Sequence, residues 1–325
     1  METKPNYYFI AVSTKHNLDL CIKYGLAGFP NSKNGAWAFL DINEGDFISF
    51  VYGARSYNLY RVSRKTAIEK AENLPPWENI IHKESGKTYY FPFRIELTLV
   101  REFSESIVRL EFAYIAENLL LRGGYKKTHF QADQTTLQNV SSMGAKFDGE
   151  LHRLKYEKLN EFSPKLTFGK NNVRKPYVYK FEEVFLQSII KHSLSIKNNI
   201  ISLLEAINFQ EALNLNLEVL SERALTQGLI DILLKESTPI GTSKQIVIEI
   251  KTKKASIKDL EQVEAYVKEI GADCIGGILI AKDFQKTIFN KDTPVRLVNY
   301  KFENQDDGTY DFEFLIKNLI LSPIN

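Results

Sequence analysis

The sequence predicts two domains: an N-terminal α+β domain and a C-terminal α/β domain. The chain has 325 residues, which is enough for two separate hydrophobic cores. Residues 1–140 mix short strand-like runs with helical patterns, whereas residues 180–325 follow the order helix, strand, strand, helix, strand, which is typical of an α/β domain. Between them, residues 141–179 are rich in glycine, proline, asparagine and charge, so we expect a connector there.

The N-terminal domain is expected to be built mostly of strands. Short apolar runs bounded by turn formers predict strands at residues 8–12, 46–52, 59–62 and 91–100. Helices are expected at residues 67–73 and 107–121, and a short one at 151–159 within the connector.

The composition is that of an ordinary soluble globular protein. Hydrophobic residues make up 44% and charged residues 25% of the chain. The net charge is only +2, so a surface that binds nucleic acid would have to be local.

The chain is expected to be cytoplasmic. Cys21 and Cys274 fall in different domains and have no metal-ligand spacing, which fits a reducing compartment. Lys4, Asn6 and Lys15 interrupt the early residues, so no secretory signal is indicated. No apolar run approaches the ~20 residues of a membrane helix, and no membrane association is expected.

Two strand-like segments each carry an acid among apolar residues. Residues 229–234 are apolar apart from Asp231, and residues 246–251 are apolar up to Glu249 and Lys251. An isolated ionised carboxylate in such a strand would cost several kcal/mol, but two that converge are tolerated around a divalent cation. Period-2 alternation places Glu249 and Lys251 on one side of their strand. The alternative is that both acids lie on solvated strand faces.

A helix is predicted after the second of these strands, over residues 256–267. Ser256 can cap its start, and Gly271 follows its last apolar residue. Gln262 and Tyr266 stand four residues apart and therefore share a helix face.

A helix is also predicted before the strands, over residues 181–190. Its apolar residues recur on one face, and Glu182 falls near the middle of that face with Glu183 at its edge. A core-facing glutamate needs a partner, and the metal site would supply one. We therefore select Glu182 as the third acid, with Glu183 as the alternative.

Taken in this order, these residues resemble the PD-(D/E)XK nuclease superfamily, in its RecB-like branch with the Q-x-x-x-Y motif. The residues that carry the resemblance are Asp231, Glu249, Lys251, Gln262 and Tyr266. The resemblance covers about residues 181–281 and implies a restriction-endonuclease-like α/β/α domain. Ile230 departs from the family pattern, which usually has proline before the aspartate.

The resemblance implies a phosphodiesterase site that uses Mg²⁺, which Mn²⁺ can replace. Its implied ligands are Asp231, Glu249, Glu182 and the backbone carbonyl of Ile250. Lys251 would position or deprotonate the attacking water, or neutralise the scissile phosphate. The glutamine and tyrosine of the following helix would orient the DNA backbone or support the metal ligands.

The N-terminal segment resembles the PUA-like group that contains YTH and EVE domains, including those of some McrB-type restriction proteins. The matching features are an early strand, the small-residue and tryptophan segment 35–38, the strand after Gly45-Asp46, and the loop 74–77. The resemblance covers about residues 6–140 and implies a β-barrel that binds a modified base flipped into an aromatic pocket. Trp37, Tyr52 and Trp77 are the candidate pocket walls, with core or rim positions as the alternative.

The two resemblances together predict a modification-dependent endonuclease of the type II or type IV restriction kind. Its expected partner is double-stranded DNA, possibly methylated. A homodimer is expected at least on DNA, because one such site normally cuts one strand. Two alternatives stay open: a repair or structure-specific nuclease of the same superfamily, and a non-catalytic nucleic-acid-binding protein with a structural metal.

Overall fold

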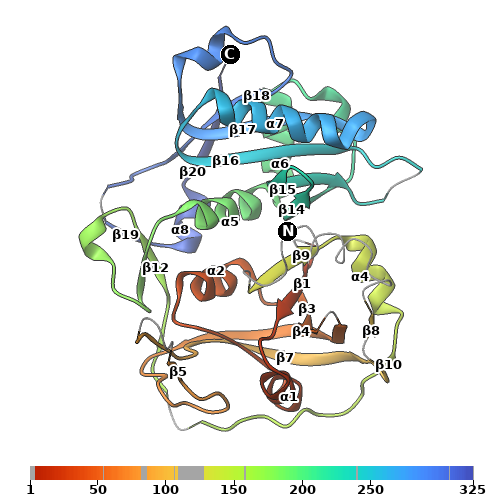
Figure 1. Cartoon of the computed structure of the whole chain (residues 1–325), viewed down its shortest axis with the longest axis vertical. Helices are drawn as coiled ribbons and strands as arrows, with labels where there is room; N and C mark the ends of the chain where they lie inside the picture. Colours follow the sequence, from red (N-terminus) through yellow and green to blue (C-terminus); the bar gives the residue numbers. More distant parts are fainter. Residues whose placement is uncertain are drawn as a thin grey trace. The chain divides into compact units, whose positions relative to one another are not determined.

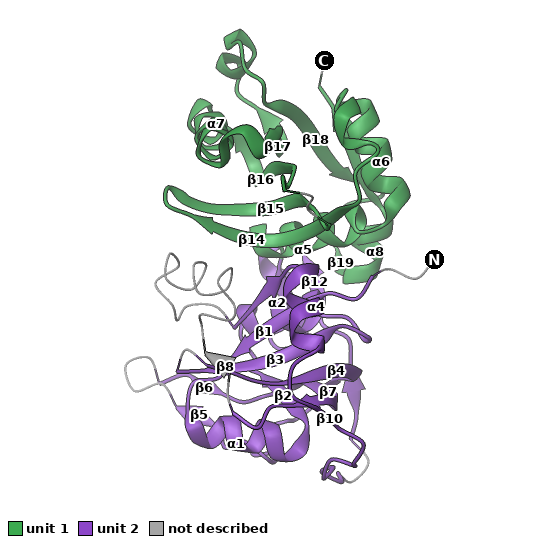
Figure 2. Ribbon diagram, turned by 90° about the vertical axis from the view of Figure 1, so that its right-hand side faces the viewer, with its two compact units in different colours: residues 1–3, 181–325 green, residues 4–180 purple. Residues whose placement is uncertain are grey.

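The computed structural model describes residues 4–53, 55–81, 86–105, 107–108, 128–156, 159–238, 241–306 and 308–324. The chain divides into two compact units (Figure 2). Residues 4–180 form the N-terminal unit and residues 181–325 the C-terminal unit. No helix within the described ranges is long and apolar enough to span a bilayer.

The N-terminal unit is organised around one branched sheet (Figure 1). Its main path runs β10-β7-β4-β3-β1-β9, with β2 paired to β7 and both β8 and β11 paired to β4. β1 and β3 are parallel, and the other pairs are antiparallel. The strands are β1 (Tyr7–Ala11), β2 (Leu26–Phe29), β3 (Phe47–Tyr52), β4 (Arg55–Ile68), β7 (Phe93–Glu102), β8 (Ile107–Val108), β9 (His129–Ala132), β10 (Ala145–Lys146) and β11 (Glu161–Phe162).

Helices and short strands accompany this sheet. The helices are α1 (Lys15–Tyr24), α2 (Lys33–Asp41), α4 (Gln134–Ser141) and the 3₁₀ turn η2 (Lys170–Asn172). The short strands are β5 (Ile80–Ile81) paired with β6 (Thr88–Tyr89), and β12 (Lys165–Thr167) paired with β13 (Val178–Lys180).

The sheet does not close into a barrel through the strands that the structure describes. Its path ends at β9 on one side and at β10 on the other. The mixed sheet-and-helix architecture predicted for this half is present, whereas the PUA-like barrel is not shown.

The helix predicted at residues 67–73 is wrong. β4 continues to Ile68, and a turn follows in which Lys70 and Asn73 have positive φ values of 52° and 60°. Two left-handed residues so close together are incompatible with a helix. The helix predicted at residues 107–121 begins with the strand β8, and residues 109–121 lie outside the described part of the chain.

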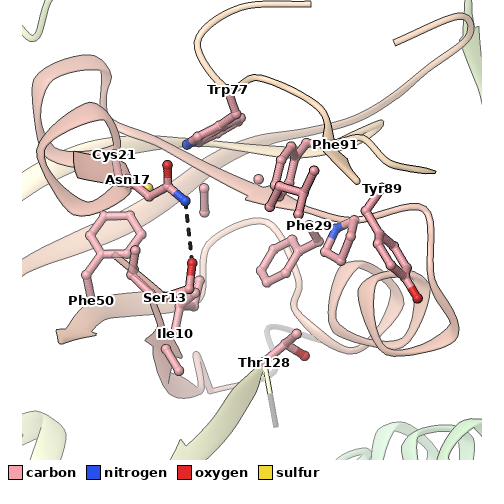
Figure 3. Close-up of a pocket in the computed structure, with 16 residues that line it drawn as sticks. Ile10, Ser13, Asn17, Cys21, Phe29, Phe50, Trp77, Tyr89, Phe91 and Thr128 are labelled. Atoms are coloured by element: carbon pink, nitrogen blue, oxygen red, sulfur yellow. Dashed lines mark hydrogen bonds between the residues drawn. The ribbon is translucent and has the colours of Figure 1, made fainter. Parts of the chain in front are cut away.

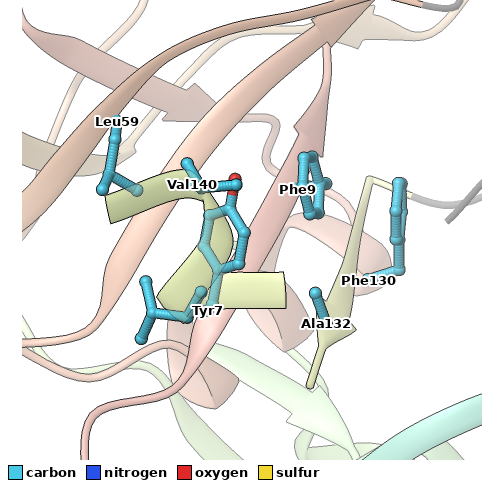
Figure 4. Packing of buried hydrophobic residues seen from close by; sticks show 7 residues of the cluster. Tyr7, Phe9, Leu59, Phe130, Ala132 and Val140 are labelled. Carbon is cyan, nitrogen blue, oxygen red and sulfur yellow. The ribbon is translucent and has the colours of Figure 1, made fainter. Parts of the chain in front are cut away.

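The central strand β1 is covered on both faces. Tyr7 and Phe9 pack with residues of α4, β4 and β9 in one buried cluster (Figure 4). Tyr8 points the other way, and its hydroxyl donates to the main-chain carbonyl of Asp41 at the end of α2 at 3.2 Å. A strand that is buried on both faces is expected to have a continuous run of apolar residues, as β1 has in the sequence.

Residues 141–179, which we expected to be a connector, hold the four short strands β10 to β13 and belong to the N-terminal unit. Tyr179 is buried, and its ring lies 6.2 Å from that of Phe93 on β7. The short helix predicted at residues 151–159 is absent from residues 151–156, which the structure describes without helix.

The C-terminal unit contains a six-stranded sheet in the order β14-β15-β16-β17-β18-β20. β16, β17 and β18 are parallel neighbours, whereas β14 and β15 on one side and β20 on the other pair antiparallel. The strands are β14 (Leu217–Leu225), β15 (Gly228–Glu236), β16 (Gln245–Ala255), β17 (Cys274–Phe284), β18 (Arg296–Phe302), β19 (Thr309–Asp311) and β20 (Leu319–Pro323). The helices are α5 (Glu183–Leu194), α6 (Lys197–Ala206), α7 (Ile257–Ile270), α8 (Phe312–Lys317), η3 (Gln210–Ala212), η4 (Gly271–Asp273) and η5 (Lys286–Asn290).

The sheet lies between layers of helical structure (Figure 2). A methyl group added at Gly276 of β17 would meet the ring of Phe209, whereas one added at Gly277 would meet Val263 of α7. Adjacent residues of a strand face opposite sides, so α7 and Phe209 cover opposite faces. The two glycines allow both layers to approach the sheet closely.

The predicted elements around the acids are confirmed. β15 and β16 contain the two apolar runs, and residues 230–234 and 245–250 are buried. α7 begins with a capping box formed by Ser256 and Asp259, and Gly271 ends it with a φ of 76°.

Candidate active site

Asp231 and Glu249 lie side by side where β15 and β16 separate. The two strands pair antiparallel up to Ile232 opposite Ile248, and the same register continued by one residue puts Asp231 opposite Glu249. Residues opposite each other on antiparallel strands point to the same face, with Cβ atoms about 4.5–5.5 Å apart. The two carboxylates therefore converge because of strand register.

The main chain also contributes to the fork, the point where β15 and β16 separate beside Asp231 and Glu249. The main-chain N–H of Ile250 donates to Oδ2 of Asp231 at 2.7 Å. We expected the main-chain carbonyl of Ile250 to be a ligand of the metal; in the structure its main-chain N–H contacts the aspartate. This bond lowers the pKa of Asp231, but less than burial raises it.

The two acids are buried and repel each other. Asp231 is 8% exposed and Glu249 2% exposed. Burial, and then the charge of Glu249, raises the pKa of Asp231 well above its ordinary value. Burial also raises the pKa of Glu249 to about 7, although Lys251 acts in the opposite direction. In the folded protein the ionised forms of both acids are therefore disfavoured unless a positive charge compensates them.

Lys251 places a positively charged ammonium group beside the two acids. Its Nζ donates to Oε1 of Glu249 at 2.7 Å, as period-2 alternation along β16 allows. Burial lowers the pKa of Lys251, but the carboxylate of Glu249 raises it above the usual value, so the ammonium stays charged. One lysine offsets part of the charge of two carboxylates.

Gln262 and Tyr266 support the fork from α7. Nε2 of Gln262 donates to the hydroxyl of Tyr266 at 2.6 Å, and that hydroxyl donates to the main-chain carbonyl of Leu229 at 3.1 Å. Tyr266 is fully buried and meets β15 two residues before Asp231. A methyl group at Gly228 would lie 2.5 Å from the same hydroxyl, so this glycine leaves room for the contact. These two side chains thus brace the strand that carries the aspartate.

Glu183, at the start of α5, contributes to the electrostatics of the acid pair. α5 begins at Glu183, and Glu182 is its N-cap residue with extended dihedral angles. Our choice of Glu182 placed it on a helix face, but it precedes the helix. The charge of Glu183 raises the pKa values of both Asp231 and Glu249, although it is a smaller cause than burial.

The residues present fit a magnesium-type cation. Oε2 of Glu249 is buried and has no hydrogen-bond partner among the described residues. No three His, Cys, Asp or Glu side chains within the described ranges converge closely enough to hold a metal without other ligands. Mg²⁺ is usually held by one or two carboxylates and keeps several waters, so a two-carboxylate site suits it.

Without metal, the protein is expected to lose stability as the pH rises from about 4 to 7. The pKa of glutamate in an unfolded chain is about 4.3, against about 7 for folded Glu249. At a pH below the unfolded pKa, Glu249 is protonated in both the folded and the unfolded chain, and the acid does not reduce the free energy of unfolding. Between the two pKa values only the unfolded chain releases the proton, so the free energy of unfolding falls as the pH rises. Above the folded pKa this loss of stability is complete.

This penalty amounts to roughly 4 kcal/mol at most. Glu249→Gln should remove much of the pH dependence, measured as urea unfolding in EDTA at pH 5 and pH 8. Equal pH dependence in wild type and variant would show that Glu249 does not carry the penalty.

The N-terminal unit contains an aromatic cavity of about 270 Å³ (Figure 3). At ~30 Å³ per water this is room for about nine waters, or for one flat ring system. None of the described side chains that line the cavity is charged, and its polar lining includes Ser13, Asn17 and Thr128. The aromatic side chains are Phe29, Phe50, Trp77, Tyr89 and Phe91.

Trp77 forms one wall of the cavity, and contacts with Gly28 and Arg94 hold its ring in place. A methyl group at Gly28 of β2 would lie 2.3 Å from the indole, so the ring packs directly on the glycine. The buried guanidinium of Arg94 lies 5.5 Å from the indole centroid. Arg94 also donates to the carbonyls of Leu74 and Pro75 and to the hydroxyl of Tyr156. The loop that carries Trp77 is therefore held by one arginine.

Trp37 and Tyr52, our other two candidate walls, are not among the residues that line this cavity. Trp37 lies in α2, is buried, and packs edge-on against His129 with ring centroids 4.5 Å apart. Tyr52 is the last residue of β3 and is half-buried. Phe91 was missed, although the aromatic run that contains it was the available signal.

The site of the C-terminal unit resembles that of a nuclease domain. Two acids and a lysine lie where two strands of a mixed sheet separate, and a glutamine and a tyrosine support them. The family model that matches is the Endonuclease NucS C-terminal domain, over residues 215–300. This match covers about a quarter of the chain and contains the acid pair, Lys251, Gln262 and Tyr266. No curated protein matches the chain.

Solved structures with partial similarity are endonucleases. The crystal structure of a repair endonuclease from Pyrococcus abyssi is 17% identical over 30% of this chain and 43% of that chain, with a TM-score of 0.21. The EndoMS–dsDNA2 complex is 12% identical over 91% of this chain and 98% of that chain, also at 0.21. The DNA modification-dependent restriction endonuclease AspBHI is 10% identical over 91% and 75%, at 0.19. Scores this low do not establish a shared architecture.

Proposed function

We propose that the protein is a metal-dependent DNA endonuclease whose active site is the fork between β15 and β16. The observation that carries this proposal is the pair of buried acids, Asp231 and Glu249, with Lys251 bonded to one of them. Burial disfavours the ionised form of both acids in the absence of a cation, and the unpartnered Oε2 of Glu249 suits a divalent cation. The match to an endonuclease domain over the same residues supports the chemistry.

Asp231 and Glu249 would hold the Mg²⁺, with Mn²⁺ as a substitute. The main-chain carbonyl of Ile250 is a further candidate ligand. When bound, such an ion activates a water molecule and stabilises the charge that develops on the phosphate. Glu183 adds negative charge nearby and increases the attraction for the cation.

The other groups of the site orient its reactants. The N–H of Ile250 fixes one oxygen of Asp231 and leaves a second lone pair on that atom free. Lys251 stays charged beside Glu249, where it can hold a phosphate oxygen or orient the attacking water. Tyr266 and Gln262 keep β15, and so Asp231, in place.

We further propose that the aromatic cavity of the N-terminal unit receives one DNA base turned out of the helix. A flat uncharged ring would stack on the Trp77 indole, and an added methyl group would contact the apolar walls. The amide of Asn17 and the hydroxyl of Ser13 would hydrogen-bond the base edge. A nuclease joined to such a cavity would act as a modification-dependent restriction enzyme on methylated double-stranded DNA.

Cleavage of matched plasmids tests both proposals. The plasmids are unmodified or carry methyladenine, methylcytosine or a larger base modification, each incubated with Mg²⁺ or with EDTA. We expect cleavage with Mg²⁺ only, and preference for one modified plasmid. Cleavage of branched or mismatched DNA alone would instead favour a repair or structure-specific nuclease. DNA binding without cleavage under all conditions would favour a non-catalytic protein.

The C-terminal unit is expected to cut DNA without the N-terminal unit, because its acids, lysine and supporting helix all lie within residues 181–325. A fragment of these residues should retain Mg²⁺-dependent nicking but lose preference for modified DNA. Circular dichroism establishes whether it folds. A fragment that does not fold would show that the two units depend on each other for stability.

A homodimer on DNA is the simplest way to cut both strands, because one site of this kind cuts one strand. Sedimentation velocity with and without a cognate duplex should show a species of twice the chain mass on DNA. Clean double-strand cutting by a species that stays monomeric would exclude the stable dimer.

A further inference from the structure

Gln187 is in direct contact with the acid pair, although the sequence analysis gave it no role. It lies on α5 one turn after Glu183, on the same helix face. Its side chain is 6% exposed, and its Nε2 donates to Oδ1 of Asp231 at 2.5 Å. Its Oε1 is buried without a hydrogen-bond partner among the described residues.

The orientation of this carboxamide is determined by Asp231. When Asp231 is ionised, as a cation ligand must be, a carboxamide turned the other way would place Oε1 against a carboxylate oxygen, and two acceptors would meet with no hydrogen between them. With Nε2 on the aspartate, both oxygens of Asp231 are engaged, one by Gln187 and one by the main chain of Ile250. The plane of the carboxylate is thereby fixed, and each oxygen keeps a lone pair for a further ligand.

Anchoring of α5 does not account for a glutamine at this position. Four apolar residues of the helix are fully buried and pack it on the unit: Phe185, Leu186, Ile189 and Ile190. A buried carboxamide with one unsatisfied atom is costly where an apolar side chain would pack without that cost. The unsatisfied Oε1 is bonded to the same carbon as Nε2, so it too lies next to Asp231.

We propose that Gln187 is a positioning residue for the cation site of the nuclease. Its Nε2 holds the Asp231 carboxylate in the plane that a cation requires, and its Oε1 accepts a hydrogen bond from a water held in the site. This assignment rests on the proposed metal-dependent nuclease and extends it to α5. Groups that support metal ligands in this way typically change metal affinity about 10–100-fold when they are replaced.

The test measures Mn²⁺ binding to the full chain by calorimetry, without DNA, for wild type and Gln187→Met. Methionine has a similar length and fills the space but has neither a donor nor an acceptor of the same strength. We expect the Mn²⁺ affinity to fall about 10–100-fold, and cleavage at low Mn²⁺ to fall with it. Cleavage should recover in part at high Mn²⁺, because the ligands themselves are unchanged.

The matched control is Gln245→Met. Gln245 is another buried glutamine, the first residue of β16 and four residues before Glu249, and its Oε1 accepts a hydrogen bond from Arg223 at 3.3 Å. This variant should change the melting temperature but leave Mn²⁺ affinity within about twofold of wild type. Gln187→Asn serves if the methionine variant does not fold, because its shorter side chain keeps a carboxamide that cannot reach Asp231.

Three outcomes are distinguishable. Weaker Mn²⁺ binding by the folded Gln187 variant, with the control unaffected, supports the assignment. Unchanged Mn²⁺ affinity in a folded Gln187 variant of a protein that binds Mn²⁺ and cuts DNA overturns it and leaves the nuclease proposal intact. A wild-type protein that neither binds Mn²⁺ nor cuts DNA overturns both.

Discussion

Replacing Asp231 with asparagine is expected to abolish DNA cleavage and to raise the melting temperature of the metal-free protein at pH 8. Loss of the carboxylate removes a cation ligand, and the rate should fall by at least about 10²–10³-fold, as for other single electrostatic groups in active sites. Stability should rise because burial and Glu249 both penalise the ionised Asp231. Each kcal/mol gained corresponds to roughly 2–4 °C.

Asparagine suits the contacts around position 231. Its carbonyl can still accept from the N–H of Ile250, and its amide can donate to Gln187 after the glutamine carboxamide turns over. Asp283→Asn is the control. Asp283 is exposed near the end of β17, opposite Lys254 of β16, and forms an ion pair with that lysine. That change should stay within about 0.5 kcal/mol and leave cleavage intact. Cleavage by Asp231→Asn at the wild-type rate would refute the active site.

Replacing Trp77 with alanine is expected to remove the preference for modified DNA while leaving Mg²⁺-dependent cutting in place. A stacked base loses about 1–3 kcal/mol when its aromatic partner is truncated, which is a factor of roughly 5–150 in affinity. The acids and the lysine of the nuclease site lie in the other unit and should still cut unmodified DNA at high protein concentration and low salt.

Trp37→Ala provides the comparison for this experiment. Trp37 is buried against His129 and does not line the cavity, so its loss should destabilise the fold by roughly 3–5 kcal/mol without changing discrimination. Melting temperatures must be measured for both variants, together with the ratio of cleavage rates on modified and unmodified plasmids. A Trp77 variant that is destabilised but keeps its discrimination would identify the indole as core.

The acid pair could be predicted from the sequence because its signal is local. Asp231 and Glu249 are single acids in runs of apolar residues, and the strands that those runs predict are the ones observed. Tyr266 was predictable for the same reason, since helix periodicity alone places it on the face of Gln262. Each of these inferences needed only one helix or strand and the periodicity with which its side chains point to one face.

What the sequence did not predict depends on contacts between elements. The choice between Glu182 and Glu183 depended on where α5 starts, and the local pattern did not determine that residue. The role of Gln187 depends on its approach to a strand 44 residues away. The cavity takes its walls from separate segments, so Trp77 was identified by residue type and Phe91 was not identified at all.

Ile250 offers the fork its main-chain N–H, and that group is the same in every residue except proline. An alanine or a valine at this position would donate to Asp231 as well as isoleucine does, provided that β16 still packs. A comparison of amino-acid types across related chains would then record an unremarkable apolar position at the centre of the site. Proline alone would reveal this role, because it has no N–H to donate to Asp231.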